Sequence, residues 1–169
     1  DTDTILNIEN LTGGSAGDEL TGNDGVNILI GRDGSDTIIG KAGNDTFVAT
    51  GINDGNDLLD GGNDSDTVDY SALNNAANKI VVDLSTVDGS SYSDVIVTAA
   101  TGESSNSTAN DDKIKNIENI IATAGDDTIT GNSLVNIIDG GNGIDEMRYD
   151  YSSVTSTGVK VDLSTGTAT

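Results

Sequence analysis

Residues 31–50 read GRDGSDTIIGKAGNDTFVAT and contain two nine-residue units back to back. The first unit begins at Gly31 and the second at Gly40, and each places glycine, aspartate and one large apolar residue at the same offsets. Aspartate occupies position six of each unit, and the apolar residue, Ile38 or Phe47, occupies position eight. A carboxylate therefore recurs every nine residues beside backbone positions that glycine adopts more easily than other residues.

The nine-residue unit continues in both directions along the chain. Four units run without interruption over 13–48, and two more follow at 52–69 after a three-residue break. A second block of three units occupies 122–148. Position eight is Leu, Ile, Phe, Val or Met in all nine units, and position six is Asp or Asn. The position-six residues are Asp18, Asn27, Asp36, Asp45, Asp57, Asp66, Asp127, Asn136 and Asp145.

A longer repeat surrounds the two blocks. The motif NIEN precedes each block, at 7–10 and 116–119. The motif DYS follows each block, at 69–71 and 150–152, and VDLST comes after it, at 82–86 and 161–165. This order predicts a first repeat module at 1–78, a strand-containing connector with a polar loop at 79–112, and a second, shorter module at 113–169. Because the last residues lead back into the pattern of the first, we expect further copies or tandem modules of the same protein as neighbours.

The composition limits the classes of function. The 169 residues include 29 acidic and 7 basic side chains, for a formal charge of −22, and no Cys or His. Such acidity with few apolar residues is typical of disordered chains, and it argues against nucleic acid as a partner. The lack of Cys and His removes thiolate metal sites and the usual general base. No apolar run is long enough for a membrane span. Multivalent cations are the expected partners.

Position eight and its two neighbours suit a short β-strand, and the six residues before them suit a glycine-rich turn. Two units then make one 18-residue coil with a strand on each side, and successive coils stack at strand spacing. We expect Leu20, Ile38 and Leu59 to fill the core from one side, and Leu29, Phe47 and Val68 to fill it from the other. The position-six carboxylates of neighbouring coils should then stack in two columns.

The tandem unit resembles the nonapeptide repeat of RTX proteins (repeats in toxin). The resemblance covers about half of the chain and implies an all-β fold, a right-handed parallel β-roll or β-solenoid that binds calcium. It also implies that backbone carbonyls at positions two and four complete each calcium shell. The matching positions here are Asn23, Gly25, Arg32, Gly34, Lys41, Gly43, Gly55, Gly125, Gly141 and Gly143.

Stacked carboxylates repel one another unless a divalent ion lies between them. Ca²⁺ accepts carboxylate and carbonyl oxygens together, and we expect about five to eight ions and a chain that is disordered without calcium. Sites at Asn27 and Asn136 should be weaker, because their side chains are neutral. Ala16, Asp64 and Leu134 replace the position-four glycine, which predicts strained or altered turns. An EF-hand is disfavoured, because no acidic loop has glycine at six and glutamate at twelve.

Segments outside the units are also informative. Residues 79–84 and 94–98 read as strands that cap or extend the roll. Residues 101–112 read as a polar, flexible loop. Large apolar residues flank the core positions and should project from the strand faces, where either another segment or a second molecule covers them: Ile28, Ile30, Ile39, Val48 and Leu58.

These observations favour a non-catalytic, calcium-binding structural module of a secreted bacterial cell-surface protein, such as an adhesin, an S-layer protein or an extracellular filament. The family resemblance implies folding outside the cell after secretion. The alternative is the carboxy-terminal secretion and folding module of a secreted protease, lipase or epimerase. Intrinsic carbohydrate binding is disfavoured, because the few aromatic residues form no row. The sequence contains no nucleophile paired with a general base, so no residue pattern indicates an enzyme.

Overall fold

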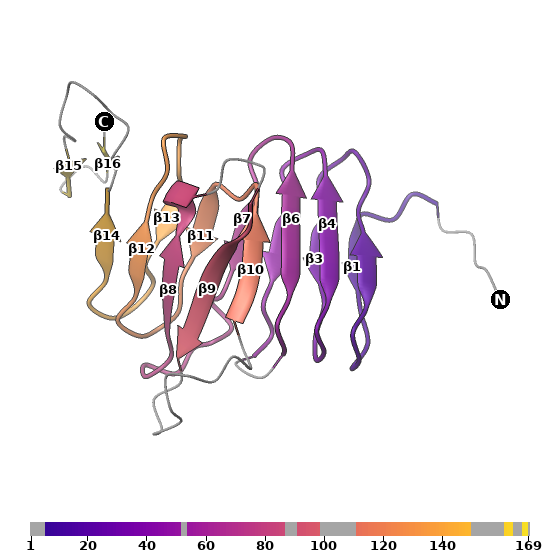
Figure 1. The fold of residues 1–169 in the computed structure, drawn as a ribbon, viewed down its shortest axis with the longest axis horizontal. Coiled ribbons are helices and arrows are strands. Elements are labelled where there is room, and N and C mark those ends of the chain that lie inside the picture. Colours follow the sequence, from indigo (N-terminus) through magenta and orange to yellow (C-terminus); the bar gives the residue numbers. More distant parts are fainter. Residues whose placement is uncertain are drawn as a thin grey trace.

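The computed structural model describes residues 6–51, 54–86, 91–98, 111–149, 161–163 and 167–168. These residues form strands and one short 3₁₀ turn, η1 (Leu84–Thr86). Two sheets lie face to face, with their strands crossing the long axis of the molecule (Figure 1). None of the described helical segments is long and apolar enough to cross a membrane. The all-β fold predicted from the repeat, a β-roll with mostly parallel strands, is confirmed.

Within each sheet, neighbouring strands come mainly from every second nine-residue unit of the chain. In spatial order the six-stranded sheet contains β1 (Asn10–Thr12), β3 (Ile28–Ile30), β5 (Thr46–Val48), β7 (Thr67–Asp69), β11 (Asn119–Ile121) and β13 (Ile138–Asp139). The eight-stranded sheet contains β2 (Glu19–Thr21), β4 (Thr37–Lys41), β6 (Leu58–Gly62), β10 (Asp111–Lys115), β9 (Ser93–Thr98), β8 (Lys79–Asp83), β12 (Thr128–Thr130) and β14 (Glu146–Arg148). A separate pair consists of β15 (Val161–Asp162) and β16 (Thr167–Ala168).

The core lies between the two sheets, and in the first block the position-eight residues fill it; buried apolar residues outside the units, such as Ile80, Val95 and Ile114, extend it. In the six-stranded sheet the register places Leu29 beside Phe47 and Phe47 beside Val68, and all three are buried. Ile38 and Leu59 face them from the other sheet, with Leu20 partly buried at its end. Strand alternation explains this arrangement, because the residues on either side of position eight point away from the core. The predicted division of the core between two sides is confirmed.

The two repeat blocks share both sheets. Strand β7 of the first block pairs in parallel with β11, and β6 pairs in parallel with β10. The buried apolar residues of both blocks form one cluster. The boundaries of the modules at residues 78 and 112 stay a prediction.

The predicted strands at 79–84 and 94–98 are present as β8 and β9, and they extend the eight-stranded sheet. Strand β9 runs antiparallel to both of its neighbours, β8 and β10, as Figure 1 shows. This pair of strands is therefore inserted between β10 and β12 in one sheet, while the other sheet continues directly from β7 through β11 to β13.

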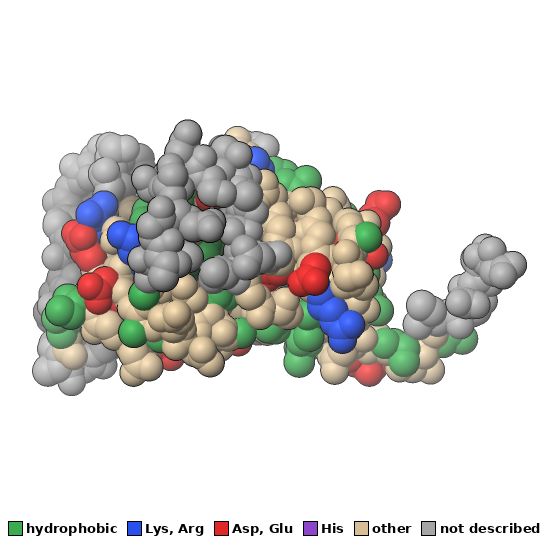
Figure 2. Space-filling model, turned by 90° about the horizontal axis from the view of Figure 1, so that it is seen from below, with side chains coloured by type: hydrophobic (Ala, Val, Ile, Leu, Met, Phe, Trp, Pro, Cys, Tyr) green, Lys and Arg blue, Asp and Glu red, His purple; other side chains and the backbone are tan. Residues whose placement is uncertain are grey.

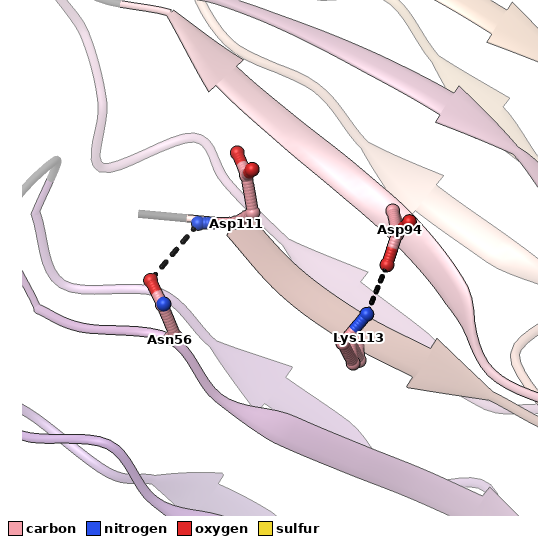
Figure 3. A network of polar contacts seen from close by, with 4 residues as sticks. All are labelled: Asn56, Asp94, Asp111 and Lys113. Carbon is pink, nitrogen blue, oxygen red and sulfur yellow. Dashed lines mark hydrogen bonds and ion pairs between the residues drawn. The ribbon is translucent and has the colours of Figure 1, made fainter. Parts of the chain in front are cut away.

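The loop predicted for 101–112 is wrong at its end. Residues 101–110 lie outside the described residues, but Asp111 and Asp112 begin strand β10. Polar contacts hold this strand in place: Lys113 forms an ion pair with Asp94 on β9, and the backbone N–H of Asp111 donates to the side chain of Asn56 (Figure 3). A strand that is polar on its outer face resembles a loop in composition, and only its pairing with β6 and β9 distinguishes the two.

The apolar residues predicted to project outward are covered to different extents. Ile28 and Leu58 are exposed, whereas Ile30, Ile39 and Val48 are half-buried. Within the described residues, therefore, part of this surface is covered by the chain itself.

Candidate calcium site

The position-six side chains form two columns, one along each sheet. In the first column the backbone N–H of Asp18 donates to the carboxylate of Asp36 at 2.7 Å, and that of Asp36 donates to Asp57 at 2.9 Å. In the second column Asn27 donates to Asp45 and Asp45 donates to the carboxylate of Asp66, both at 2.8 Å. One oxygen of each accepting carboxylate is thus used to join neighbouring coils.

The second block repeats this arrangement at its end. The backbone N–H of Asp127 donates to the carboxylate of Asp145 at 3.0 Å, and Asp127 accepts from Ile80 of the inserted strand pair at 2.7 Å. Asn136 lies on the other side, where its side-chain amide donates to the carbonyl of Glu118. The structure therefore places every position-six residue predicted from the sequence at the turn before a strand, in contact with a neighbouring coil or at the end of a column.

Position-one glycines make room for the carboxylates. A Cβ added to Gly31, Gly40 or Gly61 would overlap the carboxylate at position six of the same unit. None of these three glycines has a positive φ angle. Glycine is needed at position one because there is no space for a Cβ, and not because of the backbone conformation. The turn is thus shaped around a carboxylate that is held close to the main chain.

Positions two and four hold the unusual backbone conformations. In the units at 31–39 and 40–48, Arg32, Gly34, Lys41 and Gly43 all have positive φ, with values of 74° for Arg32 and 89° for Lys41. Left-handed conformations are strained for residues with a Cβ, so tertiary contacts must hold them. The same conformation occurs at Gly55, Gly62, Asp64, Gly141 and Gly143. It does not occur at Asn23, Gly25 or Gly125, which were predicted to be equivalent.

Turns without these positive φ angles are closed by a hydrogen bond of their own. The backbone N–H at position two donates to the side chain at position six in the units of Asp18, Asn27, Asp127 and Asn136, as in Asn23 to Asn27 at 2.8 Å and Thr123 to Asp127 at 2.9 Å. The units with Ala16 and Leu134 belong to this closed class, but so do the units that keep Gly25 and Gly125, so replacement of the position-four glycine does not account for the closed turn. Asp64 instead keeps a left-handed backbone at φ 79°, which confirms a strained turn.

We call the turns with positive φ angles at positions two and four open turns. In three of them the position-six carboxylate has one oxygen without a hydrogen-bond partner. Asp36, Asp45 and Asp66 are 1%, 1% and 0% exposed, and the Oδ2 atom of each is buried without a hydrogen-bond partner within the described residues. A buried carboxylate oxygen without a partner is costly, because it has lost its hydration and gained nothing in return. These three oxygens are therefore well suited to bind a cation.

The pKa values of the carboxylates in the columns are also raised. Burial raises the pKa of Asp57 and of Asp66 to about 7, and neighbouring carboxylates add to the rise. Burial also raises the pKa of Asp36, Asp45 and Asp127 above the ordinary value of aspartate. Backbone hydrogen bonds act in the opposite direction but do not cancel the loss of hydration. A cation bound beside these groups would favour their ionised forms.

Sequence reasoning missed several acidic residues that continue the columns. Asp112 accepts from the backbone N–H of Asp57 at 3.0 Å and from the hydroxyl of Tyr70 at 2.9 Å, and burial raises its pKa to about 7. Glu118 accepts from the backbone N–H of Asp66 at 3.0 Å. A local signal existed, because Asp112 and Glu118 each stand two residues before an inward-pointing isoleucine, as position six does before position eight.

Asp54 was also missed. It is buried, and it accepts from the backbone N–H groups of Thr50 and Gly51, which form the three-residue break in the repeat together with Ala49. Asp54 therefore helps to close the turn that the break lengthens. Sequence gives no comparable signal here, because Asp54 stands at position three of its unit.

The carboxylates follow one another along the columns and are not gathered around one point. Within the described ranges, no three acidic side chains converge at a point where they would hold a metal ion by themselves. Ca²⁺ takes six to eight oxygens and accepts backbone carbonyls as readily as carboxylates. A calcium ion beside Asp36, Asp45 or Asp66 would therefore draw most of its ligands from the turn backbone.

Comparison with known families agrees with this geometry. The family model of the RTX calcium-binding nonapeptide repeat, in four copies, matches residues 12–47, 53–75 and 116–147, which together exceed half of the chain. The chain belongs to the RTX calcium-binding repeat family. None of the curated proteins compared with it is a match. The resemblance seen in the sequence is confirmed, and the repeat is one that binds calcium.

The residues present fit calcium. The unpartnered oxygens of Asp36, Asp45 and Asp66 are hard, anionic ligands, and the glycines at position one leave each carboxylate room beside the backbone. The ion would supply positive charge to groups that the fold has removed from water. In return, the fold supplies carboxylates already positioned by their bonds to the neighbouring coil.

Proposed function

We propose that this RTX repeat is a non-catalytic structural module of a secreted bacterial cell-surface protein, and that it folds when it binds calcium outside the cell. The observation that carries the proposal is the set of three buried, unpartnered carboxylate oxygens of Asp36, Asp45 and Asp66. Without a cation these groups oppose folding, and with one they join adjacent coils. Calcium then decides whether the chain is folded.

The ligands we propose are the position-six carboxylates together with carbonyls at positions two and four of the open turns. Asp36, Asp45 and Asp66 are the best candidates, because their second oxygen is not used by the turn. Arg32, Gly34, Lys41 and Gly43 have the left-handed backbone that distinguishes these turns from the closed ones. At Asp18, Asn27, Asp127 and Asn136 the closing bond must first break, so calcium should bind there more weakly.

The dependence of folding on calcium suits a protein that is exported before it folds. Cytoplasmic calcium is scarce, so the acidic columns would keep the chain unfolded before export. Among surface proteins, an adhesin, an S-layer protein or an extracellular filament would use such a rigid module as a spacer. The duplicated higher-order pattern supports this parentage over the single terminal module of a secreted enzyme. The full-length protein sequence would distinguish a surface protein from a secreted enzyme, because an enzyme would carry a catalytic domain beside this module.

Circular dichroism of the purified chain tests calcium-dependent folding directly. We expect a largely disordered spectrum in chelator and a β-rich spectrum after calcium is added. Magnesium at the same concentration serves as the control, and it should restore much less structure, because it prefers octahedral sites and retains its water. A spectrum that is already β-rich in chelator and does not change with calcium would contradict the proposal.

A further inference from the structure

Two segments of the chain share both a sequence and a backbone conformation. The terminal NIEN segment (residues 7–12) and the internal NIEN segment (residues 116–121) each contain Asn-Ile-Glu-Asn followed by two residues. The asparagine that begins each segment has a positive φ angle, 56° at Asn7 and 53° at Asn116. Because few residues other than glycine adopt this conformation, the two segments are structurally equivalent.

One side of each segment makes the same contacts. The terminal segment pairs with β3, where Leu11 lies beside Leu29, and the internal segment pairs with β13, where Ile120 lies beside Ile138. The next residue in the chain after each segment donates a backbone hydrogen bond of 2.8 Å to that neighbouring strand. The equivalence therefore extends from backbone conformation to packing.

The other side is covered in only one of the two segments. The internal segment packs against the unit at 61–69: β11 pairs with β7, and the backbone N–H of Asp66 donates to the carboxylate of Glu118 at 3.0 Å. The terminal segment has no such neighbour in the described part of the chain, where β1 pairs with β3 alone. As a result Ile117 is 0% exposed, whereas its counterpart Ile8 is 48% exposed.

The surface of the molecule reflects this difference. Hydrophobic side chains are visible at the end of the roll where β1 lies (Figure 2). Leu6, just before the terminal segment, is 74% exposed. An apolar strand edge of this kind can pair with another strand through its unpaired backbone groups.

The opposite end of the roll carries a unit like the one that covers the internal segment. The unit at 140–148 begins Gly-Gly-Asn and has Asp145 at position six, as the unit at 61–69 begins Gly-Gly-Asn and has Asp66. The second glycine of each has a positive φ angle, and the first lies against the position-six carboxylate. Asp145 is exposed where Asp66 is buried, and among the described strands β14 pairs only with β12.

The internal NIEN segment and the unit at 61–69 form an interface inside the molecule. The counterpart of each half, the terminal NIEN segment or the unit at 140–148, therefore lies at one end of the roll. We propose that the terminal NIEN segment of one copy docks on the unit at 140–148 of a second copy, so that β1 pairs with β14. The backbone N–H of Asp145 would then donate to the carboxylate of Glu9, as Asp66 donates to Glu118 within the chain. Figure 1 shows β1 and β14 at opposite ends of the two large sheets, with the separate β15–β16 pair beyond β14; each molecule would engage one neighbour through β1 and another through β14.

The two surfaces of this contact differ, so the association is head-to-tail. Such an association adds copies in a row unless the rotation between them closes a ring. One side chain of the internal junction lacks the same partners: Asn119 donates to Ser65 and Thr67, and the equivalent residues are Ile144 and Glu146. The junction between copies therefore rests on backbone pairing, the Glu9 carboxylate and the burial of Ile8.

This inference goes beyond the proposed function, because it concerns the ends of the roll and not its calcium sites. Sedimentation velocity of the intact chain in saturating calcium tests it, over a wide range of protein concentration. We expect the mean sedimentation coefficient to rise with concentration. Folding is checked separately by circular dichroism, so a failure to bind calcium is distinguishable from a failure to associate.

Two variants with matched exposure locate the contact. Ile8→Lys places a charge on the proposed edge, and Ile96→Lys places one on β9, where the side chain is 45% exposed. We expect Ile8→Lys to lose the concentration dependence entirely and Ile96→Lys to retain it, with both variants giving the wild-type circular dichroism spectrum. Equal behaviour of the two variants would overturn the proposal.

Mixing tests the direction of the contact. Fluorescently labelled Ile8→Lys retains its unit at 140–148 and should join the free terminal segment of wild-type molecules, so that the label co-sediments with shortened oligomers. If like ends associate through the NIEN segments, the labelled variant will not join the wild type, and the head-to-tail proposal is wrong. A wild-type chain that stays monomeric at all concentrations in calcium would also refute it, and would assign the edge to another partner.

Discussion

Replacing one buried position-six carboxylate should cost far more stability than replacing an exposed carboxylate in the same turn. Asp36 is 1% exposed, one of its oxygens accepts the backbone N–H of Asp18, and the other has no partner within the described residues. Asp33, three residues earlier, is exposed. Asp36→Ala and Asp33→Ala remove the same charge from the same turn, so the difference between them isolates the role of the buried carboxylate.

The expected magnitude follows from two losses. In Asp36→Ala the partly buried N–H of Asp18 is left without its acceptor, which costs about 1–3 kcal/mol. If the carboxylate also binds calcium, loss of that site removes about 2.7 kcal/mol of stabilisation at a calcium concentration about 100 times the dissociation constant. We therefore expect the free energy of unfolding in saturating calcium to fall by about 4–6 kcal/mol for Asp36→Ala, and by less than about 0.5 kcal/mol for Asp33→Ala.

Urea unfolding followed by circular dichroism, at saturating and at lower calcium concentrations, measures both variants. The loss in Asp36→Ala should shrink as calcium is lowered, because the contribution of the bound ion falls with its concentration. Asp24→Ala, at an exposed position of another unit, is a second control. If Asp36→Ala and the controls unfold at the same urea concentration with the same calcium dependence, the assignment of position six to the calcium columns is wrong.

Three further predictions concern the turn, the buried tyrosine and pH. Gly40→Ala should destabilise the roll by about 1–3 kcal/mol in urea unfolding, because its Cβ would overlap the carboxylate of Asp45. Gly25→Ala should cost less, because its Cβ would meet only the side-chain oxygen of Asn23, at 3.1 Å. Tyr70→Phe removes the hydrogen bond to the buried carboxylate of Asp112 and should cost about 1–3 kcal/mol in thermal unfolding; an unchanged midpoint would show that water replaces the hydroxyl. In chelator, β-structure measured by circular dichroism should increase as pH falls from about 8 to about 5. The reason is that the pKa of Asp112 is about 7 in the fold and near 4 in an unfolded chain. The folded state therefore binds more protons in this range, and a lower pH stabilises it. A chelated protein whose β-content rises with pH would contradict that sign.

Much of the fold could be predicted because its period is local. Within an uninterrupted block, two units make one coil, so Asp18 and Asp36 are neighbours in a column because they are 18 residues apart. The same period places Leu29 beside Phe47 in the core. Both statements need only the repeat length and the alternation of side chains along a strand.

The continuation of the columns could not be predicted in this way. Asp57 and Asp112 are joined although they are 55 residues apart, because the β8–β9 pair is inserted between them in the chain. No local period fixes this distance. Pairing of β6 with β10 decides it, and the composition of 101–112 suggested a loop instead.

The sequence by itself determined the nine-residue unit, the core residues of the first block and the two rows of acidic turns, because each of these depends on spacings of one coil or less. Only the tertiary structure decided which turns are closed by their own hydrogen bond and which leave a carboxylate oxygen unpartnered, and it alone showed that Ile8 and Ile117 have such different exposure. Nearly identical residues differ in these respects because their surroundings come from neighbouring coils. A residue's bonding and burial depend on what packs against it, and the local sequence does not contain that neighbour.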